Sequence, residues 1–479
     1  MRSDTILDNV VRDHPRESMI SARVWGVRAA RWFMSAVAGV RRLTGCWAMN
    51  STPTRRRFCA IRSLSTANFL RIYFCSLLNI NRSCKVLTVT ALTQPPSPAG
   101  SAPDPLFTGT VAPGFQRVVD VAASNISAGD DLGFQLAVWH DGSFVVDVAA
   151  GHVDRDRTRL QSTHDLAMTF SVSKGVLGLC VALLVEDAAL DLDRPVADYW
   201  PEFGAAGKES ITVGCLLSHR AGLPAFERVM KIADLLDWDL CVSTLAAQAP
   251  VWEPGTRHGY HPITIGYLIG EVVHRISGLL PGEFFRQRIG NPLNLDAWFG
   301  VPDAELARVL PRLRLAPAFD DDGWRETLMA SAPTFATRAT TNPLLDDLDG
   351  PAIWQADIPA VSFVSNASSL ARCYAIALGG PQQLISPETL HTVTSPVHDG
   401  PDHVLRDQAS RFGGIFQMSS PRQPMLGPTS FGHDGYTGSI AFADPDSRTV
   451  VAYLGGRPEL RPTPHSRVTR VLTAIREAL

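Results

Sequence analysis

Apolar and polar positions follow one pattern near the two ends of the chain and another in its middle. Two apolar runs, Phe134–Val138 and Ser143–Ala149, flank the polar turn 140–142, which predicts a β-hairpin. Near the C-terminus, Ser439–Ala443 and Thr449–Leu454 flank a second turn and predict two more strands. The sequence therefore places strands at both ends of the folded region.

Helical patterns fill the middle. Residues Val176–Leu190 are apolar on every side, which is typical of a buried helix. Another helix is expected after Pro262, because apolar residues recur there with a period of 3.6 until Gly278. Further helices are expected at Val118–Ala123, Ile211–Leu217, Ile232–Leu240, Leu370–Leu378 and Val468–Leu479. The order predicts an α/β protein of the α+β type. Its antiparallel sheet is built from N- and C-terminal segments, is flanked by helices and contains an inserted all-helical region.

The same patterns predict the boundaries between the N-terminal extension and the folded domain. Residues 1–112 are expected to form a basic, disordered extension that ends in a proline-rich linker at 94–103. Residues 113–479 should form the folded domain, with its sheet from about 113–165 and 360–479 and the helical region from about 166–359. The stretch 300–360 predicts no clear element, and the acidic run 320–323 within it is interpreted as a solvated loop.

Composition narrows the function classes. The chain has 479 residues, of which 45% are hydrophobic and 19% charged, as in ordinary globular proteins. Residues 1–100 carry a net charge of +11, whereas the remainder carries −14. An acidic body argues against a nucleic-acid partner. The eight cysteines are isolated, and no close set of metal ligands occurs, so we expect buried thiols and neither a metal nor a cofactor.

Targeting signals are weak. No run of ~18 apolar residues occurs, so a membrane-spanning helix is not expected. The N-terminal segment 1–100 is rich in arginine and serine, as an organelle transit peptide would be, but it lacks the ordered regions of a secretory signal. We favour a disordered extension or a segment upstream of the natural start, and a cytoplasmic location slightly over others.

The first candidate for chemistry is the pair Ser171 and Lys174, which opens the apolar helix. Residues three apart share one helix face, so the lysine amine can help remove the serine proton and create a nucleophile. The alternative is that Ser171 only caps the helix while Lys174 points to solvent. An unpaired ammonium in an apolar helix is costly, which favours the chemical reading.

Two more segments could complete a serine hydrolase. Tyr260 follows a Gly/Pro-rich approach just before a helix, and near a lysine ammonium its phenolate would be favoured, so it could act as general base. The glycines around His433 and Gly435 precede a strand. An edge strand there could offer an N–H to an oxyanion, and His433 could bind substrate or the tyrosine. A structural loop tyrosine and a plain glycine-rich hairpin are the alternatives.

The three segments, in this order, resemble the serine β-lactamase and DD-peptidase superfamily. The matches are S-x-x-K at 171–174, Y-x-x at 260–262 and H-x-G, in place of K-T-G, at 433–435. The resemblance extends to LDLDRPV (190–196), YWPEF (199–203), LLSHRAGLP (216–224) and EPGT (253–256). It covers about residues 115–479 and is strongest to class C β-lactamases and family VIII carboxylesterases.

The resemblance implies roles for these residues. Ser171 would be the acylated nucleophile, and Lys174 and Tyr260 would shuttle its proton. The backbone N–H groups of Ser171 and Tyr436 would form the oxyanion hole, beside the substrate-binding residues His433 and Gly435. His219 lies in a segment that the family uses structurally, and His261 could line the pocket.

Two departures from the family pattern point to the substrate. Class C β-lactamases have Asn where this chain has Pro262, and their K-T-G lysine is His433 here. Both changes weaken recognition of an anionic β-lactam, but neither affects acyl transfer from a neutral ester. No G-x-S-x-G occurs, which excludes an α/β-hydrolase. We therefore predict a serine carboxylesterase that acts on a small-molecule ester. The alternatives are a β-lactamase or D-amino-acid peptidase, and a non-catalytic penicillin-binding-like module; the oligomeric state is not predicted.

Overall fold

The computed structural model describes residues 70–73, 86–89, 107–311, 335–343, 347–379, 382–405, 408–456 and 466–479. The chain divides into two units, Met1–Ser101 and Ala102–Leu479. In the first unit, strands β1 (Leu70–Tyr73) and β2 (Val86–Val89) pair antiparallel. The linker at 94–103 and the acidic loop at 320–323 lie outside the described residues, so those two expectations stay predictions.

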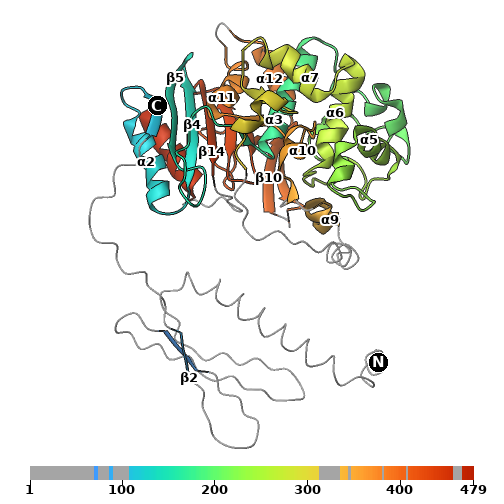
Figure 1. The fold of residues 1–479 in the computed structure, drawn as a ribbon. Coiled ribbons are helices and arrows are strands. Elements are labelled where there is room, and N and C mark those ends of the chain that lie inside the picture. The colour runs from blue at the N-terminus through green and yellow to red at the C-terminus, as the bar shows by residue number, and fades with distance from the viewer. Residues whose placement is uncertain are drawn as a thin grey trace, which may run out of the picture. The chain divides into compact units, whose positions relative to one another are not determined.

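The second unit is built on a nine-stranded antiparallel sheet of order β3-β5-β4-β14-β13-β12-β11-β10-β9 (Figure 1). Its N-terminal strands are β3 (Phe107–Val111), β4 (Gly133–His140) and β5 (Ser143–Gly151). Its C-terminal strands are β9 (Val397–Asp402), β10 (Gln408–Gly413), β11 (Phe416–Met418), β12 (Phe431–Asp434), β13 (Ile440–Asp444) and β14 (Thr449–Gly455). The predicted architecture is confirmed, since β4 pairs with β14 and so joins the two ends of the chain. The predicted start at residue 113 is too late, because β3 already pairs with β5.

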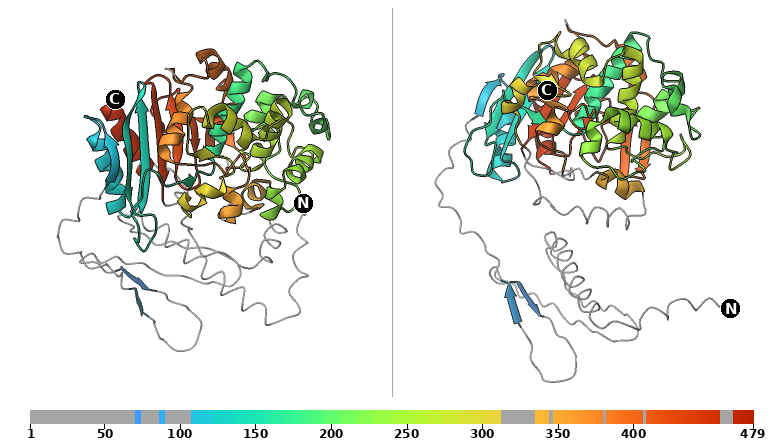
Figure 2. Two further views of the ribbon diagram at one scale, coloured as in Figure 1. Left: turned by 45° about the horizontal axis from the view of Figure 1, so that its top comes forward. Right: turned by 45° about the vertical axis from the view of Figure 1, so that its right-hand side comes forward.

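Helices cover both faces of this sheet (Figures 1 and 2). On one face, α2 (Gln116–Ser127) packs against α13 (Arg467–Ala478) over apolar side chains of β4, β5 and β14. On the other face lie α3 (Val172–Glu186), α11 (Ala367–Ala375) and α12 (Pro387–Val393). Asn366 caps α11 by accepting a hydrogen bond from Ser369 N–H, as its sequence predicts.

The inserted region is mainly helical but not entirely so. Its α-helices are α4 (Val213–Leu217), α5 (Trp238–Ala247), α6 (Thr264–Ser277), α7 (Pro281–Phe285), α9 (Phe335–Thr341) and α10 (Pro351–Trp354). Its short 3₁₀ helices are η1 (Val196–Asp198), η2 (Pro201–Gly204), η3 (Ala233–Leu236) and η5 (Asp303–Arg308), and η4 (Arg286–Gly290) is a π-helix. Strands β6 (Ala167–Met168), β8 (Val364–Ser365) and β7 (Ala297–Trp298) form a small second sheet, which corrects the expectation of an all-helical region. Strands of two residues are too short to leave a periodic signal.

Helix α3 runs through the core that joins the sheet to the helical region. Nearly all of its residues are buried, as its apolar sequence predicts. Two glycines make this close packing possible: a Cβ at Gly175 would collide with the Tyr374 hydroxyl, and one at Gly178 would lie 2.7 Å from Phe416. Within the described ranges, no helix is both long and apolar enough to cross a bilayer.

Candidate active site

Ser171 stands at a sharp turn between β6 and α3. The preceding residue, Phe170, has a positive φ of 51°, which is strained for a bulky side chain. The turn is fixed from both sides: Thr169 N–H donates to Phe363 O at 2.8 Å, and Phe363 N–H donates to Ser173 Oγ at 3.1 Å. The strained turn thus places Ser171 at the first turn of a rigid, buried helix.

The structure brings the three predicted catalytic side chains together. Lys174 Nζ lies 3.0 Å from Ser171 Oγ, and Tyr260 OH lies 2.9 Å from the same oxygen. Lys174 is fully buried, its Nζ also donates to Ala360 O at 3.0 Å, and it stands 5.0 Å from the centre of the Tyr260 ring. The alternative in which Lys174 points to solvent is therefore wrong.

The electrostatics of the trio differ from the sequence expectation. Burial lowers the pKa of Lys174 well below its ordinary value, and the charge of Asp434 only partly opposes this. Burial likewise raises the pKa of Tyr260, against the hydrogen bond with Ser171. Burial therefore opposes the Tyr260 phenolate that the sequence led us to expect, and it also disfavours the charged form of the neighbouring Lys174. The arrangement suits a neutral lysine as base and a neutral phenol as proton donor.

His433 lies on β12 with its ring 5.8 Å from the Tyr260 ring. Its Nδ1 is 2.7 Å from Asp434 O, and burial lowers its pKa, so the ring is neutral at pH 7. Among the described residues it makes no hydrogen bond to Tyr260. The expectation of an edge strand is also wrong, since β12 lies between β11 and β13. Pairing with β11 stops at Gly432, however, which leaves the last part of β12 open on that side.

The loop after β12 packs directly on the serine turn. Gly435 approaches Thr169 O so closely that a Cβ would collide with it, and Gly435 N–H donates to Ser439 O at 2.7 Å. The ring of Tyr436 lies 5.6 Å from that of Phe170. Glycine here is required for the close approach, as its sequence context predicts.

Two histidines near the site form hydrogen bonds with backbone groups. His261 is fully buried, its Nε2 accepts from Leu223 N–H at 3.0 Å, and its Nδ1 lies 2.5 Å from Gly259 O. Both ring nitrogens are thereby used, so the expectation that His261 could line the pocket is wrong. His219 is also buried and accepts from His261 N–H at 3.1 Å, in agreement with its predicted structural role.

The sequence gave no sign of Asp402, which holds Tyr260 in place. Its carboxylate oxygens each lie 3.1 Å from Tyr260 N, and Oδ2 lies 3.1 Å from His258 Nε2. Burial raises the pKa of Asp402, but the hydrogen bond and charge of His258 and the backbone N–H groups lower it more, so it ends below its ordinary value. No local signal marks this residue, because its role depends on where the end of β9 meets the loop before α6.

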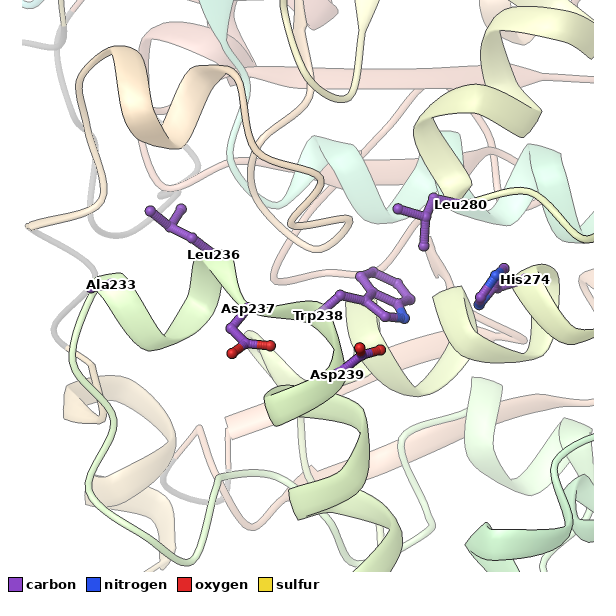
Figure 3. A pocket seen from close by; sticks show the side chains of 7 residues that line it. All are labelled: Ala233, Leu236, Asp237, Trp238, Asp239, His274 and Leu280. Atoms are coloured by element: carbon purple, nitrogen blue, oxygen red, sulfur yellow. The ribbon is translucent and has the colours of Figure 1, made fainter.

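A separate surface hollow of about 600 Å³ lies in the helical region (Figure 3). It is lined by Ala233, Leu236, Asp237, Trp238, Asp239, His274 and Leu280. Two of its polar groups are already engaged, since Asp237 accepts from Leu240 N–H and Trp238 Nε1 donates to Glu271. The hollow contains none of the three candidate catalytic residues.

Comparison with known proteins identifies the family of the chain. Residues 122–472 match the family described as Beta-lactamase. The chain is 31% identical over 392 residues to "Esterase/beta-lactamase LipL" of Mycobacterium tuberculosis, which covers 77% of this chain and 88% of that protein. Among solved structures, a family VIII carboxylesterase superposes with a TM-score of 0.71 at 30% identity, covering 78% of this chain and 100% of that one. A penicillin-binding protein homologue from Caulobacter crescentus gives 0.69 at 34%, with the same coverage.

Proposed function

The chain belongs to the Beta-lactamase family of serine hydrolases, and we propose that it cleaves carboxylic esters through an acyl-Ser171 intermediate. The observation that carries this proposal is the position of Ser171 Oγ, which has Lys174 Nζ at 3.0 Å and Tyr260 OH at 2.9 Å. The names of the relatives support the ester substrate, since both LipL and the family VIII structure are described as esterases.

Acylation begins with proton transfer from Ser171 to Lys174. Burial lowers the pKa of Lys174 and so favours the neutral amine that can accept this proton. As the Ser171 O–H bond breaks, Oγ forms a bond to the ester carbonyl carbon, and the carbonyl oxygen becomes an oxyanion. The backbone N–H groups of Ser171 and Tyr436 are proposed to hold this oxygen.

The tetrahedral intermediate then loses its alcohol. Tyr260 donates its phenolic proton to the leaving oxygen as the carbon–oxygen bond breaks, and it regains a proton from the Lys174 ammonium. Both groups lie about 3 Å from the same Ser171 oxygen, so the exchange needs little movement. In the second half, water gives a proton to Lys174 and attacks the acyl carbon, and Ser171 is released with its proton restored.

Two side chains favour esters over β-lactams. Pro262 is buried in the turn just before α6 and has no side-chain amide to bind an acylamino group. His433 is neutral and buried, so it offers a substrate carboxylate no fixed positive charge. Hydrolysis of β-lactams or amides by the same machinery is the second candidate, favoured by the double description of LipL.

Replacing Ser171 with alanine tests the proposal. We expect Ser171→Ala to lower hydrolysis of p-nitrophenyl butyrate by at least about 10³-fold, because both half-reactions pass through this oxygen. Ser243→Ala, at an exposed site on α5, is the matched control and should retain activity. The acyl-enzyme should also be detected by mass spectrometry on Ser171 of the wild type. Full activity of Ser171→Ala would refute the mechanism, and nitrocefin turnover equal to ester turnover would favour the second candidate.

A further inference from the structure

The end of β12 presents an unused hydrogen-bond acceptor beside the catalytic trio. His433 Nδ1 faces Asp434 O at 2.7 Å, and a carbonyl can only accept, so the proton of the neutral ring resides on Nδ1. The other nitrogen, Nε2, therefore carries a lone pair. It is buried, and within the described residues it has no hydrogen-bond partner. An unsatisfied buried acceptor costs free energy, which a donor on a bound ligand would restore.

The next residue adds a negative charge beside the same imidazole ring, on its Nδ1 side. Asp434 Oδ1 lies 3.5 Å from His433 Nδ1, and about a third of the Asp434 side chain is exposed. Its backbone N–H is held by Gln417 Oε1 at 2.9 Å, so the residue is fixed although its carboxylate reaches solvent. Burial raises the pKa of Asp434, but its contacts with His433 and the charges of Arg422 and Lys174 lower it more, and the carboxyl stays ionised.

Apart from its contact with His433, Asp434 forms no ion pair within the described residues, although Arg422 and Lys174 act on it at longer range. Lys174 and Tyr260 are both shifted toward their neutral forms by burial. Asp402 is occupied by the Tyr260 backbone and His258. Arg422 acts on both Asp434 and Tyr260 from a distance, but it forms no ion pair within the part of the chain that the structure describes.

We propose that His433 Nε2 and the Asp434 carboxylate form an acceptor subsite for a protonated amine of the substrate. This inference rests on the proposed esterase function and names its substrate class: esters that carry an ammonium group on the acyl or the alcohol side. A carboxylate-bearing ester meets a carboxylate and a lone pair at this subsite, so it is disfavoured.

Matched esters that differ only in charge test the subsite. In one series the charge lies on the acyl side: p-nitrophenyl esters of heptanoic, ω-aminohexanoic and pimelic acid are neutral, cationic and anionic. In the other it lies on the alcohol side: isopentyl butyrate is compared with protonated dimethylaminoethyl butyrate in a pH-stat. We expect a cationic ester to exceed its neutral partner in kcat/KM by about fivefold in at least one series, and the anionic ester to be the poorest substrate.

The variant Asp434→Asn provides the decisive comparison. It should abolish the cationic-to-neutral ratio of kcat/KM while Asp120→Asn, on α2 across the sheet, leaves that ratio unchanged. Raising the salt concentration to about 1 M should also reduce the ratio in the wild type, because the carboxylate is partly exposed. Equal turnover of charged and neutral esters, an unaltered ratio in Asp434→Asn, or a preference for anionic esters through Arg422 each overturns the subsite. Failure of the wild type to cleave any ester would instead reject the esterase function itself.

Discussion

Two lysines are fully buried among the residues that the structure describes, and their hydrogen-bond partners differ. Lys208 follows η2 in the helical region, where its Nζ donates to Ala205 O, Ala246 O and Gln248 O at 2.7, 2.9 and 2.6 Å. Lys174 has one such carbonyl, Ala360 O, and its other hydrogen-bond partner is the Ser171 hydroxyl. Burial alone therefore does not identify a chemically active lysine. The number and kind of its hydrogen-bond acceptors distinguish it from a structural one.

The contrast between the two lysines follows from the number of N–H donors that an ammonium group carries. An ammonium has three N–H donors, and three carbonyls satisfy all of them around Lys208. Burial still lowers the pKa of Lys208, with Glu209 opposing, but this lysine keeps its structural bonds when charged. Among the described residues, Lys174 has two oxygen partners and the face of the Tyr260 ring, so its charged form has fewer acceptors than that of Lys208. A lysine that is short of acceptors and next to a hydroxyl is suited to take a proton.

The strongest test of this contrast is the substitution Lys174→Met. We expect esterase turnover to fall by about 10³-fold, because the general base is lost. The free energy of unfolding should not fall by more than about 1 kcal/mol, since an apolar side chain replaces a poorly solvated amine. Steady-state kinetics and chemical denaturation measure the two effects. A variant that stays active, or one that loses its fold, would remove the distinction between the two lysines.

The same substitution at the other buried lysine, Lys208→Met, should reduce stability and leave activity largely unchanged. Three buried carbonyls would lose their donor, so we expect the free energy of unfolding to fall by roughly 2–4 kcal/mol. Activity per folded molecule at low temperature should remain close to that of the wild type. The substitution Lys231→Met is a suitable control, because that lysine is exposed and should tolerate the change. A large loss of turnover in folded Lys208→Met would show that Lys208 also supports catalysis.

The sequence predicted the parts of both regions that depend on local spacing. Ser171 and Lys174 are one helical turn apart, so their proximity follows from the helix itself. Tyr260 was connected with them by the order of the segments in a known family. The hairpin at 140–142, the helix that ends at Gly278 and the terminal strands also carry local signals, and all are present.

What the sequence missed depends on contacts between distant segments. The acceptors of Lys208 come from the residue after η2 and from the C-terminal end of α5, about 40 residues further along the chain, so no local pattern distinguishes it from a solvated lysine. Asp402 ends the strand VHDGPD, which is polar and contains glycine and proline, and only its pairing with β10 makes it a strand. The protonation states were also missed, because they depend on how completely Lys174 and Tyr260 are removed from water.

The smallest expected effect is a shift in the pH dependence of the catalytic region. Below its pKa, Lys174 is protonated and cannot accept the Ser171 proton, so kcat/KM should rise with pH through that pKa. The charge of Asp434 raises the pKa of Lys174, and it also raises that of His433. Asp434→Asn removes this charge, so both pKa values should fall further. For a neutral ester, the rise of kcat/KM with pH should therefore move to lower pH. Because the hydrogen bonds of Lys208 go to backbone carbonyls, Lys208→Met should leave the pH dependence of kcat/KM unchanged. A shift to higher pH in Asp434→Asn would mean that this rise reports a different group, and that Lys174 is not the base.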